Sequence, residues 1–454
     1  MEKVSKWREV KIDDIKSPTA NSMSTGPFGS SISSKYFQDF GIPVIRGSNL
    51  SGDIGTRLID NEIVFLSEEK ASEFNRSFAL EGDLIFTCWG TINQIGLIDR
   101  RARFNKYVIS NKQMKLTPDD KQADSLYLYY LFSSRAFQNK ITSQAIGSSV
   151  PGFNLGQLRS TSILLPPLPI QRQIAAILSA FDDKIELNRQ MNRTLEAMAR
   201  ALFQSWFVDF DPVRAKMRGE QPEGMDAETA ALFPDELAVV EGREVPKGWM
   251  WVAFDSLVQI LGGGTPKTSN ADFWGGTIPW YSVVDVPNDG DVWVLDTSKH
   301  ITEAGLANSP TKLLPVGTTI ISARGTVGKL ALTAVPMTMN QSCYGLFPCD
   351  KASTYFTYLS TLHAIHELKG KVHGAVFDTI TKETLSTVTS ISPAPRIVAA
   401  FEQTSGDLMS QILGNLRESA YLSTLRDALL PRLLSGEVDV SEWAEMSGEA
   451  LEMV

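Results

Sequence analysis

The most regular pattern of apolar and polar positions in the chain lies between Leu165 and Phe207. It starts at a cluster of prolines, which can begin a helix but cannot continue one. Apolar residues then recur every seven positions in two adjacent rows, which predicts a long amphipathic helix with the narrow seam of a coiled coil. The two rows are Ile174, Phe181, Leu195 and Leu202, and Leu178, Ile185, Ala199 and Trp206.

The same pattern recurs between Pro393 and Leu434, shifted by 227 residues. Because 227 is not a multiple of seven, the match indicates an internal duplication rather than a chance overlap of two periodic seams. Asn188 and Asn415 are polar residues at equivalent seam positions. We expect the two helices to pair antiparallel and to bring these asparagines face to face, where they would fix the register. The alternative is that both side chains point to solvent.

The segment before each helix is also repeated, with offsets that fall along the chain. A strand-like stretch at Ile42–Leu50 recurs at Ile278–Val286. A tyrosine-rich, helix-like stretch at Ser125–Ile141 recurs at Thr354–Gly370. Stepwise offsets indicate shorter loops on one scaffold, and loops vary where function varies.

The predicted order is therefore domain, helix, domain, helix. The predicted fold class is α+β, with two mixed α/β domains separated by two long antiparallel coiled-coil helices in a pseudo-two-fold repeat. The expected boundaries are a first domain at 1–168, a helix at 169–208, a linker at 209–245 with one short helix near Ala227–Leu232, a second domain at 246–393, a helix at 394–435 and an acidic tail at 436–454.

Composition narrows the possible environments. The chain is 43% hydrophobic and 21% charged, as in ordinary globular proteins. It has no apolar run long enough for a membrane span and no secretory signal. Its three cysteines have neither the spacing of a zinc site nor that of a disulfide set. A cytoplasmic protein is therefore expected. The net charge of −9 disfavours nucleic-acid binding, but the acidic residues concentrate on the helices, the linker and the tail. DNA contact by the two domains therefore remains open.

The sequence lacks a P-loop, the motifs G-x-S-x-G and H-E-x-x-H, and the glycine loop and NPPY-like tetrapeptide of an adenine methyltransferase. A nuclease site of paired carboxylates stays open, although no residues single one out. The glycines at Gly262–Gly264 are followed by Thr265 and Pro266, which is typical of a turn and not of a nucleotide-binding helix entry. The histidines at positions 363, 366 and 373 have no partners with convincing metal-ligand spacing. No metal site is expected, and the chain is interpreted as a binding protein whose catalytic partners are separate.

The whole arrangement resembles the specificity subunits of type I restriction–modification enzymes. The resemblance rests on the stretches PLPIQRQIAAIL and FDPVRAKMRG and on the repeated IPxx strand followed in the second domain by RGTVG. It implies that each domain is a target-recognition domain reading one half of a bipartite, asymmetric double-stranded DNA site. It also implies that the helices dock two methyltransferase subunits, which recruit restriction subunits. S-adenosylmethionine, ATP and Mg are then expected on those partners and not on this chain.

The predicted DNA contacts are mainly residues with donors that suit base edges or phosphates. Each has a structural alternative, either a polar strand end or a solvated basic turn, and Trp280 is more readily a core residue. The candidates in the first domain are Arg46, Ser48, Asn49, Arg100, Arg101, Arg103 and Lys106. Those in the second are Trp280, Tyr281, Ser282, Arg324, Lys329, Lys369, Lys371 and His373.

We expect partner subunits to dock on the flanks of the helices, with Trp206, Phe207 and Phe210 as apolar anchors. Packing of these three side chains in the core is an equally good interpretation. Two other functions compete with DNA specificity. A single-chain restriction or methylation enzyme would turn over DNA alone, and a coiled-coil scaffold would show no sequence-selective DNA binding in its complex.

Overall fold

The computed structural model describes residues 7–146, 151–349, 353–371 and 379–440. The acidic tail from residue 441 onward lies outside these ranges. The chain divides into two compact units. Unit 1 combines Met1–Asp183 with Leu422–Val454, and unit 2 is Lys184–Tyr421. Each long helix contributes one part to each unit.

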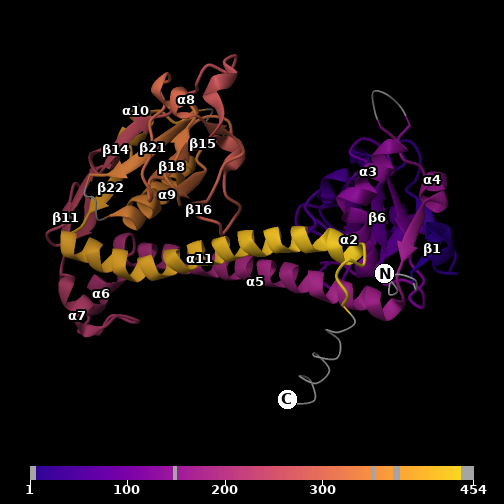
Figure 1. Cartoon of the computed structure of the whole chain (residues 1–454). Coiled ribbons are helices and arrows are strands. Elements are labelled where there is room, and N and C mark those ends of the chain that lie inside the picture. Colours follow the sequence, from indigo (N-terminus) through magenta and orange to yellow (C-terminus); the bar gives the residue numbers. More distant parts are fainter. Residues whose placement is uncertain (1–6, 147–150, 350–352, 372–378, 441–454) are drawn as a thin grey trace. The chain divides into compact units, whose positions relative to one another are not determined.

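Unit 1 contains two four-stranded sheets (Figure 1). The antiparallel sheet has the order β2 (Met23–Thr25), β9 (Gln113–Leu116), β6 (Leu84–Thr87), β7 (Ile95–Leu97). The mixed sheet has the order β4 (Val64–Leu66), β3 (Ile42–Ile45), β8 (Lys106–Ile109), β5 (Phe78–Leu80), with β3 and β8 parallel. Strands β1 (Arg8–Lys11) and β10 (Ser162–Leu165) pair as a separate ladder. The short helices are α1 (Glu68–Ser72), α2 (Ser125–Ser133), α3 (Arg135–Ser143) and α4 (Leu155–Ser160).

The expected helix at Ser125–Ile141 is broken into α2 and α3. Ser134 has extended backbone angles and ends α2, and its hydroxyl accepts a hydrogen bond from the Phe137 N–H at 3.4 Å. A serine in this role caps the first turn of the following helix, where the backbone N–H groups lack intrahelical partners. One serine therefore both ends α2 and starts α3.

The main core of unit 1 is completed by the long helices. Ile174 and Leu178 from α5 and Leu430 and Leu433 from α11 are buried in one cluster with the sheet and with α2. Val440 joins the same cluster. The first domain thus buries its apolar face against residues from the opposite end of the chain.

Unit 2 repeats the strand order of unit 1 (Figure 1). Its five-stranded sheet is β14 (Val258–Gly262), β21 (Cys343–Pro348), β18 (Thr319–Ser322), β19 (Leu330–Thr333), β16 (Trp293–Val294). Its three-stranded sheet is β17 (His300–Ile301), β15 (Trp274–Tyr281), β20 (Thr338–Met339), with β15 and β20 parallel as β3 and β8 are. Strands β13 (Met250–Ala253) and β22 (Thr389–Ser392) match the β1–β10 ladder. Its helices include α8 (Glu303–Ala307), α9 (Thr354–Lys371) and α10 (Lys382–Ser386).

The segment expected to be a linker is folded. The short helix predicted near Ala227–Leu232 is α7, but the segment also forms helix α6 (Asp211–Met217) and a hairpin. The hairpin pairs β11 (Leu237–Val240) with β12 (Arg243–Pro246). Apolar residues scattered among its charges, such as Val213 and Phe233, are buried in the main core of unit 2.

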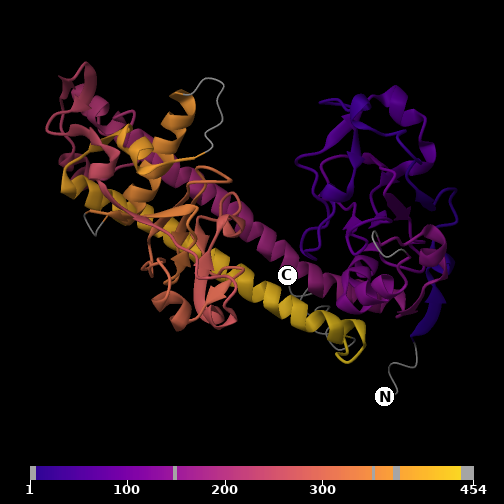
Figure 2. The same ribbon diagram turned by 90° about the horizontal axis from the view of Figure 1, so that it is seen from above.

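The long helices α5 (Leu168–Phe207) and α11 (Pro395–Leu434) contact each other within each unit (Figures 1 and 2). In unit 2, Asn188 meets Asn415, and further along α5 Phe207 meets Phe401 at a ring-centroid distance of 5.0 Å. Residue numbers therefore rise along α5 as they fall along the facing part of α11, so the helices pair antiparallel. The internal repeat and the fold class expected from the sequence are confirmed.

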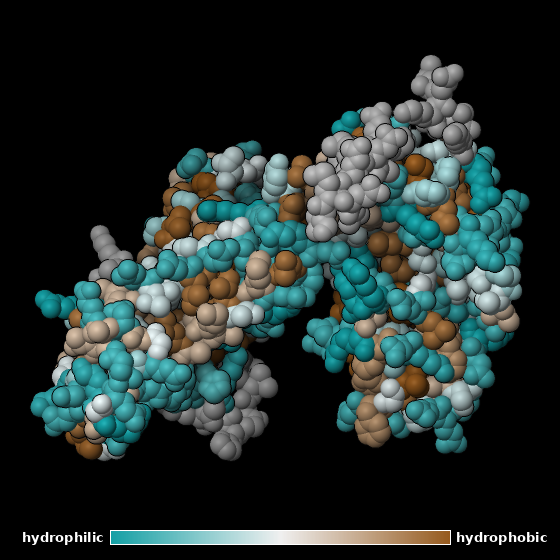
Figure 3. All heavy atoms as spheres, turned by 90° about the horizontal axis from the view of Figure 1, so that it is seen from below, coloured by the Kyte–Doolittle hydropathy of each residue, from teal (hydrophilic) through white to brown (hydrophobic). Residues whose placement is uncertain are grey.

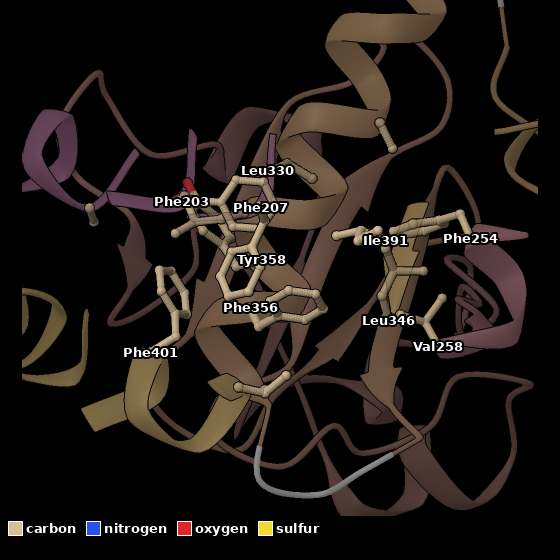
Figure 4. Close-up of a cluster of buried hydrophobic side chains, with 14 of the residues drawn as sticks. Phe203, Phe207, Phe254, Val258, Leu330, Leu346, Phe356, Tyr358, Ile391 and Phe401 are labelled. Carbon is tan, nitrogen blue, oxygen red and sulfur yellow. The ribbon is translucent and has the colours of Figure 1, made fainter. Parts of the chain in front are cut away.

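Aromatic residues dominate the core of unit 2 at the helix pair. Phe203 and Phe207 from α5, Phe401 from α11 and Phe356 from α9 point toward one another (Figure 4). Leu346 and Ile391 extend the cluster across the sheets. This packing buries the C-terminal end of α5, for which the sequence allowed either a partner interface or a core position.

Candidate nucleic-acid interface

A tight turn follows β3 in unit 1 and holds three of the predicted DNA contacts. The Arg46 N–H donates to the Asn49 carboxamide oxygen at 2.9 Å, and the Asn49 amide donates to the Ile59 carbonyl at 2.8 Å. Asn49 is only 1% exposed. Its prediction as a DNA contact needs correction, because both ends of its side chain are occupied inside the protein and shape the turn.

Arg46 and Ser48 remain accessible and line a cavity of about 600 Å³. Strand ends of the antiparallel sheet supply Thr87 and Gln113, which are paired across β6 and β9. Trp89 forms another wall and is 50% exposed. The turn therefore brings two predicted residues together with three that the sequence analysis did not select.

The missed residues carried only weak signals. Trp89 stands beside Gly90, and Thr87 lies two positions before Trp89. Gln113 lies far along the chain, on β9. Their convergence depends on the β6–β9 register, which the sequence pattern alone does not fix.

The basic run of the first domain is tied to neighbouring carboxylates. Arg100 and Arg101 approach Asp183 of α5 at 3.8 and 3.7 Å. The Arg103 N–H donates to Asp60 at 2.7 Å. Lys106 lies over the Phe78 ring at 3.6 Å. All four cations lie away from the cavity lining, and Arg100, Arg103 and Lys106 remain exposed.

A buried ionic cluster joins the first domain to both long helices, and the sequence analysis did not predict it. Asp182 of α5 is fully buried and lies 2.7 Å from an Arg426 guanidinium nitrogen of α11. The Tyr130 hydroxyl donates to the same carboxylate, and Arg57 lies 3.9 Å away. Burial lowers the pKa of Arg426, but its bonds to Asp182 and Asp427 outweigh burial and raise it overall. Arg426 is therefore held charged inside unit 1.

The equivalent turn in unit 2 follows β15 and differs in chemistry. Trp280 is buried, and its indole N–H donates to the Gly264 carbonyl at 3.0 Å. Tyr281 is fully buried, and burial raises its pKa. Both predictions as DNA contacts need correction, because apolar packing encloses these side chains. Ser282 is partly exposed and donates to Asp285 at 2.9 Å.

Three predicted cations of the second domain are exposed near one glycine turn. Arg324 and Lys329 flank Gly325 and Gly328, both of which have positive φ angles. Lys369 of α9 reaches the same turn, since a Cβ placed on Gly328 would lie 3.5 Å from its ammonium nitrogen. The remaining predictions, the Lys371 side chain and His373, lie outside the described part of the chain.

The two seam asparagines lie opposite each other and are buried. The Asn188 amide donates to the Asn415 backbone carbonyl at 3.4 Å and to the Glu418 carboxylate at 2.8 Å. The Asn415 amide donates to Asn192 at 2.9 Å. The residues meet through a shared network and not through one amide-to-amide bond. Their role in setting the register stays a prediction.

Trp206, Phe207 and Phe210 are at most 4% exposed. Trp206 packs edge-on against Phe233 with ring centroids 5.1 Å apart, and Phe210 packs on Trp249 at 6.0 Å. Their prediction as partner anchors is therefore wrong, because all three side chains are packed inside the core of unit 2.

The described residues contain neither a metal centre nor a membrane span. No group of three or more histidine, cysteine or acidic side chains there could hold a metal ion. No described helix is long and apolar enough to cross a membrane. Hydrophilic residues predominate on the face drawn in Figure 3, with apolar side chains showing between them.

The fold defines a class of protein in which one mixed α/β module and its long helix occur twice in one chain. The family model described as "Type I restriction modification DNA specificity domain" matches this chain twice, at residues 5–197 and 246–404. The chain therefore belongs to the family of type I restriction–modification specificity subunits. Subunits of this kind work within restriction–modification complexes.

Individual relatives agree with the family match. The specificity subunit of the type I restriction enzyme HindI from Haemophilus influenzae is 32% identical over 377 residues, covering 74% of this chain and 82% of that protein. The MjaIX specificity subunit from Methanocaldococcus jannaschii is 26% identical over 322 residues and covers 70% of each chain. The crystal structure of a type I restriction–modification S subunit from M. genitalium shares the fold, with a TM-score of 0.52, 14% identity, and 94% of this chain and 96% of that chain covered.

Proposed function

We propose that this specificity subunit binds an asymmetric, bipartite site in double-stranded DNA, with one half read by each domain. The observation that supports this proposal is the repeated strand order carrying different side chains at equivalent turns. Arg46 follows β3 in unit 1, and Ser282 follows β15 in unit 2. One scaffold with two dissimilar surfaces suits a DNA site with two dissimilar halves.

The chain itself is proposed to be non-catalytic. Two methyltransferase subunits would dock on it and in turn recruit restriction subunits, and S-adenosylmethionine, ATP and Mg would be bound by those partners. With Trp206, Phe207 and Phe210 buried, docking would use apolar side chains that stay exposed on the long helices. The candidates are Leu187, Met198 and Tyr421.

The deciding experiment maps methylated adenines in DNA from cells that carry this chain with its methyltransferase partner. We expect one motif with two dissimilar halves and an unread spacer. Exchange of residues 246–393 for those of a relative should change one half and leave the other intact. A change in both halves, or methylation without a motif, would contradict the proposal.

A second measurement tests the assignment of catalysis to partners. The purified chain is incubated with labelled S-adenosylmethionine and DNA carrying the mapped motif. We expect methyl transfer only after the methyltransferase subunit is added. Transfer by the chain alone would make it an enzyme.

A further inference from the structure

The cavity beside the turn after β3 contains buried polar atoms that lack hydrogen-bond partners. The Arg46 Nε, the Thr87 hydroxyl and the Gln113 amide nitrogen are all buried and unpaired within the described part of the chain. Thr87 is 3% exposed and Gln113 is fully buried, yet both line the cavity. A buried donor without a partner destabilises the folded state, so three such groups at one site point to a ligand that pairs with them.

The donors converge because secondary structure holds each of them. Thr87 and Gln113 face each other in the ladder of β6 and β9. The Gln113 carboxamide oxygen already accepts a hydrogen bond from the Ser110 hydroxyl, which turns the amide nitrogen toward the cavity. The Arg46 guanidinium stacks 5.5 Å from the centre of the Phe37 ring. These side chains therefore form a rigid set, and its available atoms are mainly donors.

An aromatic wall stands beside these donors. A Cβ built on Gly152 would lie 2.4 Å from the Trp89 ring, so the glycine backbone packs directly on one face of that ring. The rest of the side chain is half exposed at the cavity. The cavity therefore has a fixed apolar wall beside its donors.

The charge of the cavity favours an electron-rich ligand. Among the described lining residues, Arg46 and Lys112 are basic and none is acidic. In the major groove, guanine presents two acceptors, N7 and O6, and no donor. Thymine presents a single acceptor, O4, beside a methyl group, and adenine and cytosine each present an amino group. Of the three unpaired groups, the Arg46 Nε and the Gln113 amide nitrogen can only donate, so an amino group placed against them would leave these buried donors unpaired.

We infer that this cavity reads a guanine in the half-site of the first domain, with Arg46, Gln113 and Thr87 as the specificity-determining residues. The inference rests on the proposed function and adds the base and the residues that recognise it. A DNA backbone phosphate is also an acceptor, so the test separates the two sources of acceptor atoms.

The corresponding place in unit 2 lacks this donor set. Ser322 and Cys343 are paired in the equivalent ladder, as Thr87 and Gln113 are in unit 1. The Ser322 hydroxyl accepts from the Lys329 N–H at 2.9 Å and also donates to a backbone carbonyl of its own turn. Ser282 stands where Arg46 does and is bonded to Asp285. The guanine contact is therefore specific to the first domain.

The test uses the full chain assembled with its methyltransferase partner and duplexes carrying the mapped motif. The half-site of the first domain is the half that survives exchange of residues 246–393. Each guanine in that half is replaced singly by 7-deazaguanine, which lacks the N7 acceptor, and each phosphate singly by a neutral methylphosphonate. Dissociation constants are measured for the wild type, Arg46→Met and the matched control Arg135→Met, which removes an exposed arginine of α3 outside the cavity.

At one guanine, 7-deazaguanine should weaken wild-type binding roughly tenfold. Arg46→Met should bind the 7-deazaguanine duplex as tightly as it binds the unmodified duplex. The control variant should lose affinity roughly tenfold on the same replacement, as the wild type does. If no guanine position couples to Arg46, or if that half-site contains no guanine, the inference is wrong. If the effect of Arg46→Met instead depends on a methylphosphonate at one phosphate, the cavity binds that phosphate and the inference that it reads a base is wrong. The proposed function fails separately, at the mapping stage, if no bipartite motif exists.

Thr87→Val provides a second variant with a readout that a structural role would not move. The hydroxyl has no partner among the residues that the structure describes, so its replacement by a methyl group should leave the melting temperature equal to or above that of the wild type. Discrimination for guanine at the coupled position should nevertheless fall. A lower melting temperature with unchanged discrimination would contradict the assignment.

Discussion

The two units join their long helices with opposite chemistry at equivalent positions. The 227-residue shift that relates Asn188 to Asn415 also relates Asp182 of α5 to Met409 of α11. It likewise relates Ala199 of α5 to Arg426 of α11. Unit 1 therefore places a buried aspartate and arginine in contact, where unit 2 has a methionine and an alanine that are fully buried in an apolar core.

The difference separates stability from orientation. An apolar junction such as that of unit 2 gains free energy in proportion to the area buried and tolerates small shifts. A buried ion pair recovers its desolvation cost only in good geometry, so it adds little net stability but penalises misplacement. We interpret the cluster around Asp182 as the element that orients the first domain on its helices, and the aromatic core as the main source of stability in unit 2.

Phe207→Ala should produce the largest effect and should be confined to unit 2. The ring is 1% exposed and contacts Phe356 and Phe401, so its loss should cost about 3–5 kcal/mol. Hydrogen exchange followed by mass spectrometry would show faster exchange in the strands of unit 2 and little change in unit 1. Leu187→Ala, on an exposed position of the same helix, is the control and should leave both units unchanged.

Arg426→Ala should destabilise unit 1 by about 3 kcal/mol, because the buried Asp182 carboxylate loses its closest cation. The double variant Asp182→Met/Arg426→Ala transfers the apolar pair of unit 2 and should recover part of that loss. Chemical denaturation read by hydrogen exchange in β6 and β9 measures both. If the double variant is as unstable as the sum of the single variants, the charges do not act as a pair.

A smaller effect is expected from pH. Burial lowers the pKa of His363 in unit 2, with Glu367 and Asp209 opposing and His366 reinforcing the shift. The folded state therefore resists protonation, whereas the unfolded chain takes up a proton below about pH 6.5. Unit 2 should lose stability as pH falls from about 7 to 5, and His363→Gln should reduce the loss. Unit 1 has no histidine, so equal pH sensitivity of its hydrogen exchange in this range would contradict the assignment.

The helices could be predicted almost to the residue. The expected ranges of 169–208 and 394–435 compare with Leu168–Phe207 and Pro395–Leu434. The periodicity of the apolar seam and the proline at the start of each helix are local signals, so they predict the helices without knowledge of the tertiary contacts. The folded 209–245 segment was missed because Phe210 and Phe233 find their partners only in the assembled core.

The candidate DNA-binding surface was predicted less well, for a similar reason. The strand positions of Arg46 and Trp280 were recognisable from the repeated IPxx pattern, but whether each side chain faces solvent depends on neighbours from distant strands. Asn49 illustrates this point, since a carbonyl ten residues away engages its amide. The unpaired donors of Thr87 and Gln113 become visible only once β6 and β9 are in register.

The return of the C-terminal residues to unit 1 has a consequence for how the protein is made. Leu430, Leu433 and Val440 complete the core of the first domain, and Arg426 neutralises its buried aspartate. All residues of unit 2 are therefore synthesised before the C-terminal residues that complete the core of unit 1. A chain terminated just before Leu422 would retain all of unit 2 and lose the support of the domain that was synthesised first.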